Sequence, residues 1–201
     1  RILVLNSWAD SAADTRFVIT INGKSWPFTE RITLDVGDTL RARVINGSEH
    51  VVLRNITVLN ETSGGFMSGV NDVQVIGGEI GNIDPGDGIH FNNQYGRSTN
   101  IVIDGLYMHD LTRTRDGSAH NDGIQTGDVD GLTIRNSIFT NSGTQGIFLN
   151  PYNGGVTNNV LVENNFLGSA QLGYNILNVR SVNNVVVRNN SFSGGDFYIG
   201  P

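Results

Sequence analysis

One segment of this chain concentrates residue types that perform acid–base chemistry. Residues 109–130 hold two of the four histidines, five aspartates and two arginines. Histidine titrates near neutral pH, and arginine binds carboxylates through paired hydrogen bonds. The segment therefore predicts a site of proton transfer on an acidic substrate, with the candidate catalytic residues His109, Arg113, Arg115, His120 and Asp122.

A pair of aspartates adds a second kind of chemistry. The tripeptide Asp-Gly-Ile occurs at residues 87–89 and again at 122–124. If Asp87 and Asp122 lie close together, their like charges raise the pKa of one of them and supply an acid and a base at one pH. The same two carboxylates could instead share a Ca²⁺ ion, although the sequence requires no cofactor. A third interpretation is structural, because Asp-Gly is a common turn signal.

Further polar and aromatic residues are candidates for binding a substrate. Aromatic rings stack on sugars when they are exposed, and Trp8, Trp26, Tyr95 and Tyr152 are such rings, although aromatic residues more often pack. The residues predicted to contact the substrate directly are Asp87, His90, Tyr107, Gln125 and Gln145.

The composition indicates what kind of scaffold must position these residues. The 201 residues include 26 glycines, and the apolar residues, mostly Val, Ile, Leu and Phe, occur in short runs. That composition disfavours helices and favours an all-β chain. A net charge of −6 argues against nucleic-acid binding, which needs a basic face. No apolar run approaches the roughly 20 residues of a membrane span.

The chain contains an internal repeat. The pattern apolar-x-apolar-x-(Asn/Gly)-x-x-apolar recurs six times. The spacing between successive Asn/Gly positions ranges from 22 residues (55 to 77) to 31 residues (105 to 136). The six positions are Asn55, Gly77, Gly105, Asn136, Asn164 and Asn189.

Each repeat predicts one coil of a stacked structure. Two alternating apolar residues indicate a strand with one buried face, the Asn or Gly suits a sharp left-handed bend, and the last apolar residue begins a second strand. A third short strand follows at segments such as Asp-Gly-Ile. Coils of this size bury their apolar residues only by stacking. Stacking places Asn136, Asn164 and Asn189 in line, which predicts a ladder of side-chain amides.

The repeat resembles that of the right-handed parallel β-helix proteins of the pectate-lyase-like superfamily. The resemblance covers residues 50–201 and rests on the N-V-x-V-x-N-N-x-F and D-G-I segments. The segment H-N-D-G-I-Q at 120–125 is most similar to one found in uncharacterised bacterial secreted members. The resemblance implies an all-β right-handed parallel β-helix, a polysaccharide partner, and a secreted or cell-surface location.

This interpretation divides the chain into two regions. Residues 50–201 are predicted to form a parallel β-helix of about six coils. Residues 1–49 lack a clear repeat and predict an irregular N-terminal β cap or a small β module, with strands near 17–21, 31–34 and 39–45. Open ends of the solenoid predict self-assembly, and the start at Arg1 predicts a processed chain.

Aligning the coils predicts which residues share a surface column. With Ile89, Ile124, Ile147 and Ile176 taken as equivalent inward positions, the preceding outward column is Asp87, Asp122, Gln145 and Tyr174. The following column is His90, Gln125, Phe148 and Leu177, with the last two expected to turn inward at a bend. The longest repeat contains residues 109–122, and loops that protrude from a solenoid commonly carry function.

These positions favour β-elimination on a uronic-acid-containing polysaccharide. In this hypothesis Arg113 or Arg115 binds the carboxylate, and His120 or His109 removes the adjacent proton. Tyr107 protonates the leaving oxygen. One alternative is a glycoside hydrolase that uses Asp122 with Asp87 or Asp116. The other is a non-catalytic carbohydrate-binding or structural β-helix, such as a tailspike, adhesin or filament segment.

Overall fold

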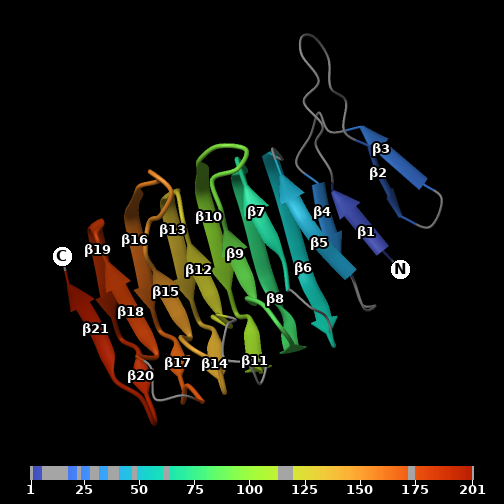
Figure 1. Ribbon diagram of the computed structural model, residues 1–201. Coiled ribbons are helices and arrows are strands. Elements are labelled where there is room, and N and C mark those ends of the chain that lie inside the picture. Colours follow the sequence, from blue (N-terminus) through green and yellow to red (C-terminus); the bar gives the residue numbers. More distant parts are fainter. Residues whose placement is uncertain are drawn as a thin grey trace.

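The computed structural model shows an all-β parallel solenoid (Figure 1). It describes residues 2–5, 18–21, 24–27, 32–35, 41–46, 49–60, 64–112, 120–171 and 175–200. These residues contain no helix, and every strand pairing outside one N-terminal hairpin is parallel. The fold class predicted from the repeat is confirmed.

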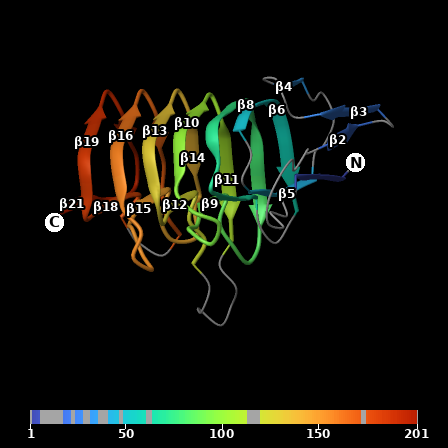
Figure 2. The same cartoon turned by 90° about the horizontal axis from the view of Figure 1, so that it is seen from above.

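Successive coils lie side by side along one axis and share three faces (Figure 2). Two long strands, β6 (Glu49–Leu59) and β8 (Asn71–Ile83), pass through a bend and belong to both the first and the second face. The first face continues with β10 (Ser98–Asp104), β13 (Val129–Arg135), β16 (Thr157–Glu163) and β19 (Val182–Arg188). The second face continues with β11 (Tyr107–Leu111), β14 (Ile138–Thr140), β17 (Phe166–Leu167) and β20 (Ser191–Phe192).

The third face carries most of the residues discussed below. It is a separate sheet in which each strand pairs in parallel with the equivalent strand of the next coil. Its strands are β1 (Ile2–Leu5), β5 (Arg41–Asn46), β7 (Phe66–Ser68), β9 (Ile89–Phe91), β12 (Ile124–Thr126), β15 (Ile147–Leu149), β18 (Leu177–Arg180) and β21 (Phe197–Gly200).

Strands from the first 49 residues extend these sheets. The strand β4 (Ile32–Asp35) pairs with β6, and β5 pairs with β7. The strands β2 (Val18–Ile21) and β3 (Lys24–Pro27) form an antiparallel hairpin. The three strands predicted near 17–21, 31–34 and 39–45 therefore correspond to β2, β4 and β5.

The bends of the coil are made where the sequence predicts them. All six Asn/Gly positions of the repeat have positive φ, from 50° at Asn55 to 72° at Gly105. A side chain in this left-handed region costs roughly 1–2 kcal/mol for most residues, and Asn and Gly tolerate it best. A second corner column, which begins with His50, also has positive φ, as expected of a turn residue.

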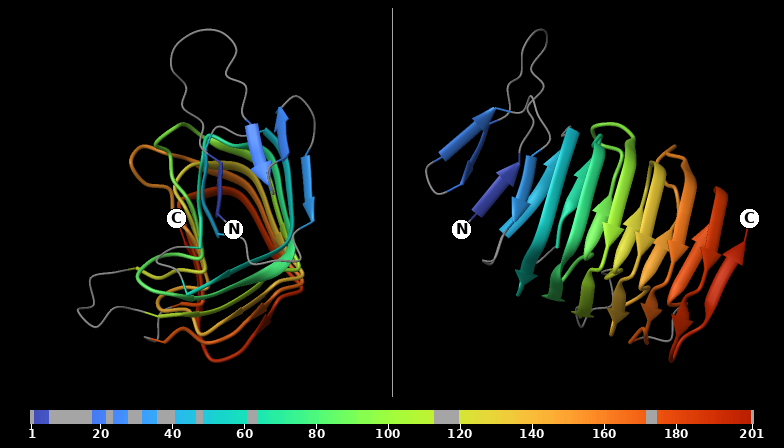
Figure 3. Two further views of the ribbon diagram at one scale, coloured as in Figure 1. Left: turned by 90° about the vertical axis from the view of Figure 1, so that its right-hand side faces the viewer. Right: turned by 180° about the vertical axis from the view of Figure 1, so that it is seen from behind.

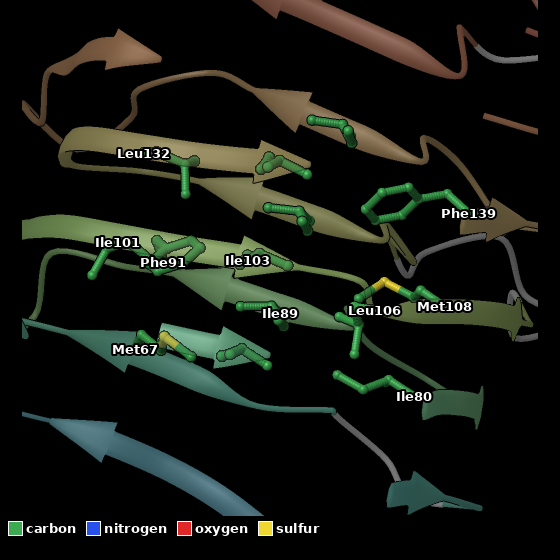
Figure 4. Close-up of a cluster of buried hydrophobic side chains, with 14 of the residues drawn as sticks. Met67, Ile80, Ile89, Phe91, Ile101, Ile103, Leu106, Met108, Leu132 and Phe139 are labelled. Atoms are coloured by element: carbon green, nitrogen blue, oxygen red, sulfur yellow. The ribbon is translucent and has the colours of Figure 1, made fainter. Parts of the chain in front are cut away.

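The interior is filled by the apolar residues of the repeat (Figure 4). In the first five repeats all three apolar template residues are buried, as illustrated by Ile101, Ile103 and Met108. Each such side chain contributes about 1.5–3 kcal/mol relative to an exposed position. The last coil differs, because Phe192, Phe197 and Ile199 are 38%, 62% and 51% exposed. Self-assembly through this end stays a prediction.

Stacked asparagines accompany the bends, one position away from the expected line. Asn164 is exposed, whereas the next residue, Asn165, is buried and donates to Asn190 Oδ1 at 3.0 Å. Asn165 Oδ1 also accepts the backbone N–H of Ser137 at 3.0 Å. The left-handed residue turns its side chain toward solvent, so the residue after it lies under the bend and forms the ladder.

Candidate functional site

A column of outward residues runs along the third face. Strand register aligns His90 with Gln125, and Gln125 with Phe148. Phe148 then aligns with Asn178, and Asn178 with Tyr198. The predicted column is thus correct for its first three members and wrong for Leu177, which aligns with the inward Ile147. Leu167 aligns with Phe139 and Leu177 with Ile147, so this coil has two more residues between those positions than the coil before it, a change that side-chain pattern alone does not reveal.

Phe148 also differs from the expectation that it turns inward. It occupies the same column as Gln125, and its ring lies 6.2 Å from the ring of His120, which is exposed. The guanidinium of Arg180 lies 5.9 Å from the Phe148 ring centre. Phe148 thus points outward, and it is only 7% exposed because these neighbouring side chains cover it.

The two aspartates are adjacent, as predicted, but they are buried instead of displayed. Asp87 is 6% exposed and Asp122 is fully buried. Asp87 Oδ1 accepts the backbone N–H of Asp122 at 2.8 Å, and Asp122 Oδ1 accepts that of Gln145 at 2.8 Å. Each carboxylate therefore holds the next coil in register. Tyr174, which the sequence predicted in the same column, lies outside the described residues.

Asp87 has a second partner that gives it a chemical role. Its Oδ2 lies 2.7 Å from Nδ1 of His90, which points outward from β9. Burial raises the pKa of Asp87, the hydrogen bond from His90 opposes that rise, and the charge of Asp122 adds to it. A carboxylate at Nδ1 selects the imidazole tautomer with its proton there, which leaves Nε2 to exchange a proton with another group.

The group at His90 Nε2 is the phenol of Tyr152, two coils farther along. The Tyr152 hydroxyl is hydrogen-bonded to Nε2, and the two rings meet edge to face with centroids 5.8 Å apart. Burial, together with the negative charge of Asp87, raises the pKa of Tyr152 to about 12. The phenol therefore keeps its proton at neutral pH and is able to donate it.

Tyr152 reaches His90 because a loop projects over the intervening coil. The loops after β9 and β15 leave the same corner of the stack (Figure 3, left, green and orange). Asn93 Nδ2 donates to the carbonyl of Asn153 at 3.0 Å and joins the two loops. Between them lies Gly127, where a Cβ would come within 2.6 Å of Cε1 of Tyr152. Glycine is therefore required there to admit the ring.

His120 lies at the other end of β12 from Tyr152. Its side chain is 58% exposed, and its Nδ1 is 3.6 Å from Oδ2 of Asp122. Among the described residues, Oδ2 of Asp122 and Oε1 of Gln145 are buried without a hydrogen-bond partner. His120 is therefore an accessible imidazole with a buried carboxylate beside it.

His109 lies on the second face, in a different environment. Its Nδ1 is 2.7 Å from Asp110 Oδ2, and its Nε2 is 2.9 Å from Glu79 Oε1. Burial lowers the pKa of His109, but the hydrogen bonds and charges of Asp110 and Glu79 outweigh burial and raise it. Tyr107, 41% exposed, stacks on the ring at 4.3 Å. The structure thus places His109 and Tyr107 on a different sheet from His90 and Gln125.

The other predicted residues fall into two groups, and two further residues join the site. Arg113, Arg115 and Asp116 lie outside the described residues. Gln125 is half-buried between His90 and Phe148 in the column. Arg180 was missed as a site residue, and Tyr152 was named only as a ring that could stack on a sugar, because each comes from another coil and the sequence places neither beside residues 109–130.

Two further predictions concern a bound metal ion and membrane spans. Within the described ranges, no group of three or more His, Cys, Asp or Glu residues is placed to hold a metal ion. Binding of Ca²⁺ by Asp87 and Asp122 stays a prediction, and both carboxylates already accept backbone N–H groups. In the same part of the chain, no helix is long and apolar enough to cross a membrane.

Comparisons with protein-family models, with curated proteins and with solved structures gave no match for this chain.

Proposed function

We propose that the protein cleaves a uronic-acid-containing polysaccharide by β-elimination on the third face. The observation that carries the proposal is the chain of contacts from Asp87 through His90 to Tyr152. It joins a carboxylate, an imidazole and a phenol in the order that passes a proton to a bound substrate. The parallel solenoid, together with the resemblance of the sequence repeat to that of pectate-lyase-like proteins, supports a secreted or cell-surface enzyme of this class.

In the proposed reaction Tyr152 is the acid and His120 is the base. His120 takes the C5 proton of the uronate, the C4–C5 double bond forms, and the C4–O4 bond breaks. The leaving O4 takes the phenol proton of Tyr152. The Tyr152 phenolate then regains a proton from solvent by way of His90 Nε2, while Asp87 Oδ2 holds Nδ1 of His90. Arg113 and Arg115 stay predicted ligands of the uronate carboxylate.

The burial of the aspartates favours this reaction over hydrolysis by the same residues. A glycosidase needs its two carboxyl groups on either side of the scissile bond. Asp87 and Asp122 are at most 6% exposed, and each binds the backbone of the next coil. They support the site from beneath.

A panel of acidic and neutral polysaccharides, followed by the ultraviolet absorbance of the new double bond, tests the proposal. Tyr152→Phe keeps the ring and removes the proton, so the rate should fall by roughly 10²- to 10⁴-fold. Tyr95→Phe, on the neighbouring loop and 56% exposed, is the matched control and should retain activity. An unchanged rate in Tyr152→Phe, or no product from any substrate, would contradict the assignment.

A non-catalytic carbohydrate-binding role is the second candidate. It is supported by the ring of Tyr198 on the same face, which is 41% exposed and suits stacking against a sugar. Retained binding with no product from the whole panel would select it.

A further inference from the structure

Arg180 differs from other arginines on the surface of the solenoid. Arg97, Arg135 and Arg188 each bond a carboxylate of a neighbouring coil at 2.8 Å. Arg180 instead donates Nε–H to the amide oxygen of Asn178 at 3.0 Å. Among the described residues, no carboxylate lies within ion-pairing distance of Arg180. Its charge is thus not neutralised by the part of the chain that the structure describes.

The guanidinium of Arg180 is held in place by more than one contact. It lies 5.9 Å from the ring centre of Phe148 and 5.5 Å from that of Tyr198. Asn178, which accepts its Nε–H, is itself only 2% exposed. Cation–π contacts and a hydrogen bond to a buried amide restrict the side chain before any ligand binds. Its terminal N–H groups remain the donors that suit a carboxylate or sulfate.

Arg180 also lies on the proposed substrate face. Asn178 belongs to the column that begins at His90, three coils away, which at about 4.8 Å per coil is roughly 14 Å. Phe148 and Tyr198 belong to the same column and flank Arg180. A ligand that follows the column from His90 therefore meets a fixed cation between two aromatic rings.

We propose that Arg180, with Phe148 and Tyr198, binds an acidic group of a glycan lying along the third face, away from the reacting bond. The group is a carboxylate or a sulfate, since both accept paired hydrogen bonds from a guanidinium. The inference rests on the proposed function in taking the ligand to be a glycan. It concerns binding alone and is tested without turnover.

The test measures affinity by calorimetry in the Tyr152→Phe background. The probes are an oligogalacturonate, its fully methyl-esterified form and a sulfated oligosaccharide of similar length. Arg180→Gln should weaken binding of an acidic probe by about tenfold or more, and Arg180→Lys by less, because lysine lacks the paired donors. Whether the uronate or the sulfated probe binds more tightly identifies the acidic group. Added salt should weaken binding of the acidic probe.

Arg188→Gln is the matched control, since Arg188 is an exposed arginine on the first face, paired with Glu163. It should leave affinity unchanged, as should Arg180→Gln with the methyl-esterified probe. Equal affinity of the parent and Arg180→Gln for every acidic probe would overturn the inference. Cleavage by the wild type would then still support the proposed function. Arg180-dependent binding without cleavage would instead contradict the proposed function and support the binding site at Arg180.

Discussion

Two histidines on neighbouring coils occupy contrasting surroundings. His109, on the second face, has a carboxylate at each ring nitrogen, from Asp110 and Glu79. His90, on the third face, has a carboxylate at Nδ1 and the phenol of Tyr152 at Nε2. Carboxylates only accept hydrogen bonds, so the first arrangement requires both nitrogens of His109 to carry protons.

The difference separates a structural ion pair from a proton-transfer chain. An imidazolium between two carboxylates is stabilised in one protonation state, and it joins β11 to β8 of the preceding coil. An imidazole between a carboxylate and a phenol has a partner that both gives and takes a proton. Histidine content alone is therefore a weak guide to a site, and the partner at the second nitrogen decides the chemistry.

The largest expected effect comes from changing the carboxylate beneath His90. In Asp87→Asn the amide oxygen can still accept the N–H of Asp122, but the amide nitrogen donates toward Nδ1 of His90. The imidazole then takes the opposite tautomer, and kcat should fall roughly 10³- to 10⁴-fold with little change in KM. Steady-state kinetics on a cleaved acidic polysaccharide measure this.

The corresponding change in the other cluster, Asp110→Asn, should leave kcat unchanged. A near wild-type kcat in Asp87→Asn would show that proton transfer through Asp87, His90 and Tyr152 does not depend on the tautomer of His90.

A smaller effect follows from closing the space that admits Tyr152. In Gly127→Ala the new methyl group would come within 2.6 Å of the phenol ring and 2.9 Å of the carbonyl of Phe91. The ring must move away from His90, and a misplacement near 1 Å costs about 10²-fold in rate. Kinetics and a crystal structure of the variant measure both consequences.

Gly154, in the loop that carries Tyr152, serves as the control, because a Cβ there meets nothing within 4 Å. Its φ of +77° is tolerated by asparagine, so Gly154→Asn should stay active. Equal losses in the two variants would assign the effect to the loop in general and not to Tyr152.

The smallest effect concerns stability and its dependence on pH. Because the folded-state pKa of His109 is raised, its contribution is complete below the unfolded value of about 6.5 and is lost as pH rises through the folded pKa. His109→Gln should cost about 1–2 kcal/mol at pH 6, since Asp110 and Glu79 are partly exposed, and less at higher pH. Melting temperatures across this range measure the difference.

The same variant tests the prediction that His109 is the catalytic base. Retained activity assigns proton removal elsewhere, as the proposed mechanism does, and lost activity supports the sequence-based role. Parallel melting curves for wild type and His109→Gln would contradict the raised pKa.

The sequence determined the solenoid and its corners. Each coil repeats the same local requirements: alternating apolar residues for a strand, then Asn or Gly where φ is positive. These requirements are met within about ten residues, so Asn55 or Asn136 could be placed from the chain alone. The pairing of Asp87 with Asp122 was also predictable, because both open the same tripeptide on adjacent coils.

The tertiary structure decided which residues form the site. Whether an aspartate faces solvent or the backbone of the next coil depends on the path of the turn. Asp87 and Asp122 are both buried and face the backbone of the next coil. Tyr152 contacts His90, although 62 residues separate them in the sequence, because its loop passes over Gly127 of the coil between them. A repeat fixes each residue within its own coil, but loops between coils vary in length and direction, and only their folded course brings these partners together.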